Sequence, residues 1–208
     1  MTFEQMFNLS NSLLDKVGSP YFTESEFDDF CNIAYNDWIE QEYNKFEINH
    51  EHSVKLDRLL VPYTKIGTEI FLTTDITNFR YLARINGEFN DTCDGLVTRN
   101  IRQAKNNNID VLKQDPFNRP TTKEPLFFIT AGPKIEVLPT ANRVNIVYVR
   151  DPQKINSDTN PTGVFELPDY LAEEIVEMAV RKQDVNTENY NQANAINNEI
   201  AQRNGVFE

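Results

Sequence analysis

The stretch YVRDPQKINSDTNPTGVFELPDYLAEEIVEMAVR, residues 148–181, decides the fold class because it joins a strand to a helix through a polar loop. Val144, Ile146 and Tyr148 alternate with Val147 and Val149 just before and within it, which is the period of a β-strand. Both faces of this strand carry apolar side chains. We therefore expect other elements to pack on each side of it.

After the loop, Leu167 and Pro168 predict the start of a helix. Its charges match the helix dipole, with Asp169, Glu173 and Glu174 near the start and Arg181 and Lys182 near the end. One stripe of this helix is apolar and consists of Leu171, Ile175, Met178 and Ala179. For Leu171, Ile175 and Ala179, packing within the subunit and packing against a partner both remain open.

The N-terminal region predicts two helices, each with a capping box. Thr2 with Gln5 begins the first, and Thr23 with Glu26 begins the second, which we expect to reach about Asn49. The second helix has an apolar stripe at helical spacing, made of Phe27, Phe30, Cys31, Ala34 and Trp38. Its neighbouring carboxylates Glu24, Glu26, Asp28 and Asp29 are typical of a solvated helix face.

The middle of the chain is rich in β-branched and aromatic residues and predicts several short strands. Asn86-Gly87 favours a hairpin turn of type I′ between two of them. The candidate strands end at prolines, namely Pro125, Pro133, Pro139 and Pro152. Residues 95–113 fit either an extended arm or a polar helix, and the sequence leaves both open.

These patterns together predict an α+β fold. N-terminal helices precede a small, mostly antiparallel β-rich middle, and C-terminal helices return onto the helical part. We place the helical part at residues 1–58 and 164–208 and the β-rich insertion at 59–163, and we expect one compact subunit overall. The polar, Asn-rich segment 184–208 is expected to become ordered against a partner.

The charge is uneven along the chain. The net charge is −12, and residues 1–51 carry 11 acidic and 2 basic residues, a net of −9, which leaves −3 for the other 157. Such an acidic surface disfavours binding to duplex DNA, so we expect no sequence-specific nucleic-acid binding. A sparse basic run, Arg99, Arg102, Lys105 and Lys113, is typical of a protein contact. The two features together favour head-to-tail association of identical copies.

No pattern in the sequence indicates catalysis. The seven glycines form no phosphate-binding loop, and no nucleophile motif is present. His50 and His52 flank Glu51 in the spacing most typical of a metal site, but further ligands are not evident, and Cys31 and Cys93 form no CxxC pair. We therefore expect neither an enzyme nor a cofactor. The sequence also predicts no secretion signal and no membrane span, so we expect synthesis in the cytosol.

Four stretches resemble the head-to-tail ring proteins, or neck adaptors, of crAss-like and related tailed bacteriophages. They are FDDFCNIAYNDWIEQEYNKFE at 27–47, DPFNRP at 115–120, IVYVRDP at 146–152 and ELPDYLAEEIVEMAVR at 166–181. The resemblance covers most of the chain, and the strand-rich middle departs from the simplest adaptors. In that family the helix after the Leu-Pro start faces the neighbouring subunit.

The resemblance implies a structural virion protein in the head-tail neck, assembled in the host cytoplasm. Its copies would form a ring, usually twelvefold, that joins the portal protein to further neck or tail proteins and lets DNA pass. The residues expected at subunit or partner contacts are Tyr170, Glu173, Glu177, Arg181, Tyr190, Ile196, Arg99 and Arg102. Two alternatives stay open: a tail-completion or capsid-associated protein that forms no ring, and a small cytosolic binding module.

Overall fold

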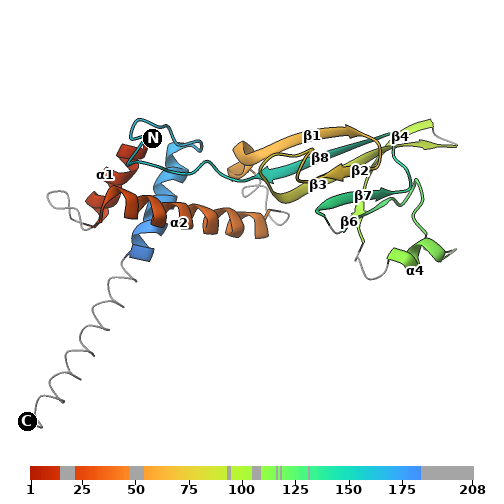
Figure 1. Cartoon of the computed structure of the whole chain (residues 1–208), viewed down its shortest axis with the longest axis horizontal. Coiled ribbons are helices and arrows are strands. Elements are labelled where there is room, and N and C mark those ends of the chain that lie inside the picture. Colours follow the sequence, from red (N-terminus) through yellow and green to blue (C-terminus); the bar gives the residue numbers. More distant parts are fainter. Residues whose placement is uncertain are drawn as a thin grey trace, which may run out of the picture. The chain divides into compact units, whose positions relative to one another are not determined.

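A computed structural model describes residues 1–14, 22–46, 54–92, 95–104, 109–115, 117, 119–130 and 132–183. The fold is α+β, as the sequence predicts. The chain divides into two compact units, a helical unit of Met1–Arg58 with Pro152–Glu208 and a β unit of Leu59–Asp151 (Figure 1). The expected single compact subunit is thus two units. The second boundary follows Asp151, whereas the sequence placed it after residue 163.

The position of this boundary has a physical reason in the loop that follows Asp151. Ile155 and Ser157 bond to residues of the second helix, and the backbone N–H of Phe3 donates to the Gly163 carbonyl oxygen at 2.9 Å. Residues 152–163 therefore belong to the helical unit. The predicted end of the β-rich insertion at 163 is wrong because the loop packs against helices that begin more than 100 residues earlier.

The helical unit contains α1 (Phe3–Leu13), α2 (Glu24–Asn44) and a helix over residues 169–183. Both predicted capping boxes are confirmed at Thr2 and Thr23. α2 ends at Asn44, earlier than the expected Asn49, which lies outside the described residues. On α2 the apolar stripe is buried except for Phe30, which is half-buried.

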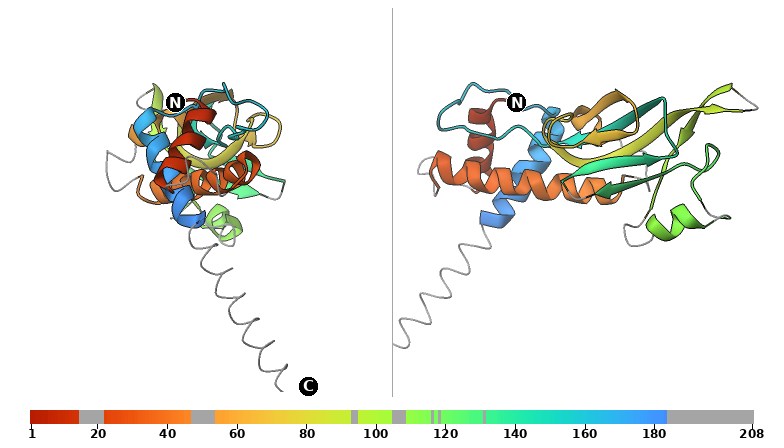
Figure 2. Two further views of the ribbon diagram at one scale, coloured as in Figure 1. Left: turned by 90° about the vertical axis from the view of Figure 1, so that its left-hand side faces the viewer. Right: turned by 45° about the vertical axis from the view of Figure 1, so that its right-hand side comes forward.

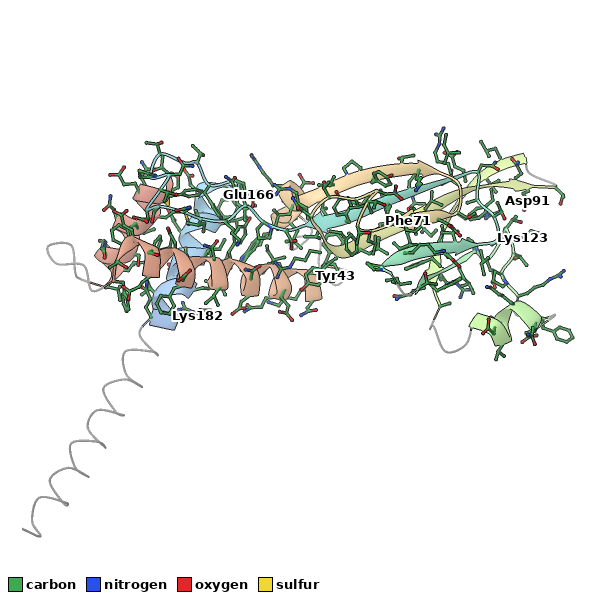
Figure 3. All side chains as sticks on the ribbon, viewed as in Figure 1. Tyr43, Phe71, Asp91, Lys123, Glu166 and Lys182 are labelled. Atoms are coloured by element: carbon green, nitrogen blue, oxygen red, sulfur yellow. The ribbon has the colours of Figure 1, made fainter. Side chains whose placement is uncertain are left out.

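The C-terminal helix begins where the sequence predicts, since the Pro168 carbonyl oxygen accepts from the N–H groups of Leu171 and Ala172 at 3.0 and 3.1 Å. It returns onto the N-terminal helices. Lys182 Nζ lies 2.6 Å from Asp37 Oδ2 of α2, and Figure 2 shows the helix beside α2. Figure 3 labels Lys182 near the end of its described part.

The β unit consists of two four-stranded sheets. The first has the order β1-β8-β3-β4, with β1 (Leu60–Ile66), β8 (Arg143–Arg150), β3 (Phe79–Asp91) and β4 (Gly95–Asn100), all antiparallel. The second has the order β2-β7-β6-β5, with β2 (Glu69–Phe71), β7 (Lys134–Leu138), β6 (Leu126–Thr130) and β5 (Arg102–Gln103). In this sheet only the β5 and β6 pair is parallel.

One apolar core fills the β unit. It contains Ile85 and Phe89 of β3, Ile146 of β8 and Ile135 and Val137 of β7. Along the longer strands, alternate residues enter this core, as the period of a half-buried sheet requires. The described residues of the segment 95–113, for which the sequence left two interpretations open, form β4, β5 and most of the short helix α4 (Ile109–Gln114). The prolines at the predicted strand ends lie just outside β6, β7 and β8.

The predicted hairpin turn at Asn86-Gly87 is wrong. Both residues lie inside β3, where Gly87 pairs with Arg99 of β4 on one side and with Val144 of β8 on the other. A Cβ atom at Gly87 would meet the Phe89 ring at 2.8 Å and Ile101 Cδ1 at 3.0 Å. Glycine is therefore present here because two side chains pack directly on the backbone.

Candidate interaction surface

The helix over residues 169–183 is apolar and buried on one side. The buried residues are Leu171, Ala172, Ile175, Val176 and Ala179. This decides the question that the sequence left open for Leu171, Ile175 and Ala179, which belong to the core of their own subunit. Only Met178 of the predicted stripe is half-buried.

The opposite side of the same helix carries four of the predicted contact residues. Tyr170, Glu173, Glu177 and Arg181 follow one another at helical intervals and are all exposed, so they form one stripe. We call this set the exposed stripe. Tyr170 is 57% exposed although its ring is large and apolar. Glu177 Oε2 lies 3.8 Å from Arg181 Nη2, and such a solvated pair contributes only about 0.3–0.5 kcal/mol to helix stability.

A hollow of about 460 Å³ lies beside the exposed stripe. Its described lining residues are Gln41 of α2 and Glu174, Glu177, Met178 and Arg181 of the C-terminal helix. Lys55 Nζ bonds to Glu174 Oε2 at 3.2 Å and lies 3.9 Å from Glu42 Oε1. The lining therefore offers an amide, two carboxylates, a guanidinium and a thioether. This set suits a polar or charged protein side chain.

Arg99 and Arg102 belong to the β unit, whereas the exposed stripe belongs to the helical unit. Arg99 is opposite Gly87, so its side chain leaves the sheet on the face of the apolar core, and its Nε is buried without a hydrogen-bond partner. Arg102 Nη2 lies 3.3 Å from Glu124 Oε2, and both side chains are exposed. Of these two predicted contact residues, Arg102 is exposed and Arg99 is half-buried.

Several predicted residues lie outside the described part of the chain. They are Tyr190, Ile196, Lys105, His50, His52 and Cys93. Among the residues that the structure describes, no group of three His, Cys, Asp or Glu side chains is arranged to hold a metal ion. Cys31 is buried, and burial together with the nearby Asp28 carboxylate raises the pKa of its thiol. The Cys31 thiol is thus held protonated.

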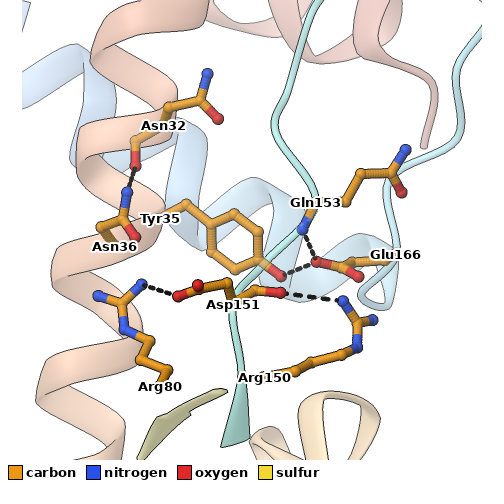
Figure 4. Close-up of polar contacts among 8 residues, drawn as sticks. All are labelled: Asn32, Tyr35, Asn36, Arg80, Arg150, Asp151, Gln153 and Glu166. Carbon is orange, nitrogen blue, oxygen red and sulfur yellow. Dashed lines mark hydrogen bonds and ion pairs between the residues drawn. The ribbon is translucent and has the colours of Figure 1, made fainter. Parts of the chain in front are cut away.

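Two polar contacts in the helical unit were not predicted from the sequence. Tyr35 Oη donates to Glu166 Oε1 at 2.8 Å, and the same oxygen accepts from the backbone N–H of Gln153 at 2.7 Å (Figure 4). Asp28 is buried and accepts from Ser157, although the sequence placed it on a solvated face. Residues separated by more than 100 positions leave no local pattern, so neither contact could be found from spacing.

Comparison with known proteins identified no relative of this chain. No protein-family model matches the sequence, and no curated protein is similar to it. Within the described ranges, no helix has the length and apolar character needed to cross a membrane.

Proposed function

We propose that the chain is a structural ring protein of a tailed-bacteriophage neck. Identical copies would form a closed ring between the portal and the tail, and DNA would pass through its opening. The observation that carries this proposal is the exposed stripe, where Tyr170 and three charged residues lie on the outer side of a helix whose inner side packs in the core of its own unit. A large exposed aromatic side chain beside charged groups is typical of a protein contact surface.

The distribution of charge between the units supports head-to-tail contacts. The β unit has 12 Lys and Arg against 10 Asp and Glu, a net charge of +2, and the rest of the chain has 8 against 22, a net charge of −14. Two like units would repel each other when both are strongly acidic. Contact between the acidic unit of one copy and the β unit of the next avoids this repulsion.

A passive role beside DNA also agrees with this charge. DNA carries one negative charge per phosphate, so a wall with a net charge of −14 per copy would not retain it. A ring that only conducts DNA needs no catalytic group.

Electron microscopy of the negatively stained, purified protein tests the proposal. We expect rings of uniform diameter with a central opening. The double variant Tyr170→Ser with Arg181→Glu should reduce the number of rings while the far-ultraviolet circular dichroism stays unchanged, since both side chains are exposed. Ile33→Ser, at an exposed apolar position of α2 outside the stripe, is the matched control and should leave the rings intact.

Other images would contradict the proposal in distinct ways. Single small particles at every concentration would favour a monomeric binding module. Discrete dimers without an opening would favour a capsid-associated or tail-completion protein that forms no ring.

A further inference from the structure

Among the residues that the structure describes, the first sheet of the β unit has two free edges. Its order β1-β8-β3-β4 gives β1 and β4 a strand neighbour on one side only. A free edge exposes unpaired backbone groups and is a template for pairing with another chain. The two edges differ in the number of backbone donors that they offer for such pairing.

At the β4 edge, three residues direct their backbone groups outward. The bond from the Ile101 N–H to the Ile85 carbonyl oxygen, at 3.1 Å, shows that Asn100 and Asn86 are opposed without bonding each other. Because the pattern alternates, the N–H and C=O groups of Leu96, Thr98 and Asn100 point away from β3. In the part of the chain that the structure describes, these groups have no hydrogen-bond partner.

At the β1 edge, the alternation of hydrogen-bonded pairs again shows which backbone groups point away from the sheet. The Gly67 N–H donates to the Asn142 carbonyl oxygen at 3.2 Å, so Ile66 and Arg143 are opposed without bonding each other. The outward groups therefore belong to Ile66, Thr64, Pro62 and Leu60. Pro62 has no N–H, so this edge lacks one donor.

The side chains at the two edges are complementary. Leu96 of β4 is 62% exposed and Ile66 of β1 is 80% exposed, and both project from the face of the sheet that is turned away from the apolar core. Thr98 and Thr64 follow them on the same face. Neither edge has a charged side chain on this face, although charges are the common protection against edge pairing.

We propose that β4 of one copy pairs with β1 of the next, so that the sheets of neighbouring copies join. The strands of the sheet alternate in direction, which makes β4 and the β1 of another copy antiparallel, like every other pair in the sheet. This inference rests on the proposed ring, because two different edges that meet head to tail generate a ring when the rotation closes. The occupant of the β4 edge is thus a second copy of this chain.

The register follows from the side chains. When Leu96 is opposite Ile66, Thr98 is opposite Thr64 and Asn100 is opposite Pro62. The first two pairs exchange two backbone hydrogen bonds each and the third makes one, which gives five. A shift of β1 by two residues keeps five bonds but places Leu96 opposite Thr64 and leaves Ile66 in water. Burial of Leu96 against Ile66 therefore selects the first register.

Disulfide trapping tests this pairing in the full-length chain. We would introduce Leu96→Cys and Ile66→Cys together in a Cys93→Ser background and oxidise the protein at high concentration. Within one copy, β1 and β4 are about 14 Å apart, three strand spacings, which is too far for a disulfide. The expected result is a ladder of covalent oligomers on a non-reducing denaturing gel. The off-register control, Leu96→Cys with Thr64→Cys, should give much less product.

A proline substitution gives the second measurement. Thr98→Pro removes an outward N–H at a position equivalent to Pro62 of β1, so the β3–β4 ladder stays intact and the thermal unfolding midpoint should change little. Loss of one interface hydrogen bond should weaken association about tenfold. Val97→Pro, whose N–H points toward β3, should instead destabilise the β unit itself.

The outcomes separate this inference from the proposed function. Suppose that rings form, that the Leu96→Cys, Ile66→Cys variant gives no disulfide between copies, and that Thr98→Pro does not weaken association. This result would overturn the edge pairing but would still agree with the proposed ring. A disulfide ladder without closed rings would support the edge pairing and contradict the ring. A covalent dimer from Thr98→Cys alone would show that β4 pairs with another β4, which also overturns the inference. Absence of both rings and disulfides contradicts both proposals.

Discussion

Asp28 and Ser157 are bonded to each other across 129 residues of chain. The Asp28 carboxylate accepts from the Ser157 backbone N–H at 2.8 Å and from the Ser157 hydroxyl at 2.7 Å, and all of these groups are buried. Ser157 is in the loop that follows the β unit, and Asp28 is in the first turns of α2. This contact fixes the point at which the chain returns to the helical unit.

Replacing Asp28 with Ala should therefore destabilise the helical unit. The buried N–H and hydroxyl of Ser157 would lose their acceptor, and an unsatisfied buried polar group costs about 1–3 kcal/mol. Urea unfolding followed by circular dichroism measures the change. The neighbouring Asp29→Ala, at an exposed position of the same helix, should stay within about 0.5 kcal/mol of the native protein. Equal effects of the two variants would contradict the role of Asp28.

Gly87→Ala should destabilise the β unit through overcrowding. The added methyl group would lie 2.8 Å from the Phe89 ring, and overpacking of a filled core costs about 1–3 kcal/mol. Thr98→Ala, at an exposed position of the adjacent β4, is the control and should be nearly neutral. Denaturant unfolding of both variants gives the comparison. A neutral Gly87→Ala would mean that the Phe89 ring does not pack on the backbone of β3.

Asp75 should make the stability of the β unit depend on pH. A hydrogen bond from Lys65, with a second from the Phe71 backbone N–H, lowers the pKa of Asp75 below 3.8. The stabilisation is complete above pH 3.8 and is lost as the pH falls through the lowered pKa, because the proton then binds the folded state. The stability difference between the native protein and Asp75→Asn should thus shrink below about pH 4. Unfolding curves between pH 3 and pH 6 test this, and a constant difference would refute it.

Cys31 should be inert in the folded protein. Burial and the neighbouring Asp28 raise the pKa of its thiol, and only the thiolate reacts with disulfide reagents. In a Cys93→Ser variant we expect no reaction with a thiol reagent at pH 8 until the protein is unfolded, and one thiol per chain afterwards. Rapid modification of the native variant would show that the α2 stripe opens readily.

The helices could be predicted from sequence because their signals are local. The capping boxes at Thr2 and Thr23 and the Leu167-Pro168 start each involve residues within one helical turn, and all three are confirmed. Gly87 shows the opposite case. A glycine after Asn is favoured in tight turns, but here it is needed because Phe89 and Ile101 pack on it. That packing depends on tertiary contacts.

The boundary of the β unit and the edge of its sheet also depend on distant residues. The sequence of residues 152–163 is polar and would suit a loop of either unit. Its bonds to Asp28, Asn32 and Phe3 assign it to the helical one. The free edge of β4 follows from its pairing with β3, which no periodicity reveals. The exposed stripe could be predicted from the sequence because residues three or four positions apart lie on the same side of a helix.

Light scattering of the purified full-length protein tests the ring most directly. The account predicts one species whose mass is a single large multiple of 24.1 kDa and does not change over a tenfold range of concentration, since a closed ring has no free ends. A species of 24.1 kDa at every concentration would contradict it. So would a mass that rises continuously with concentration, as in an open filament.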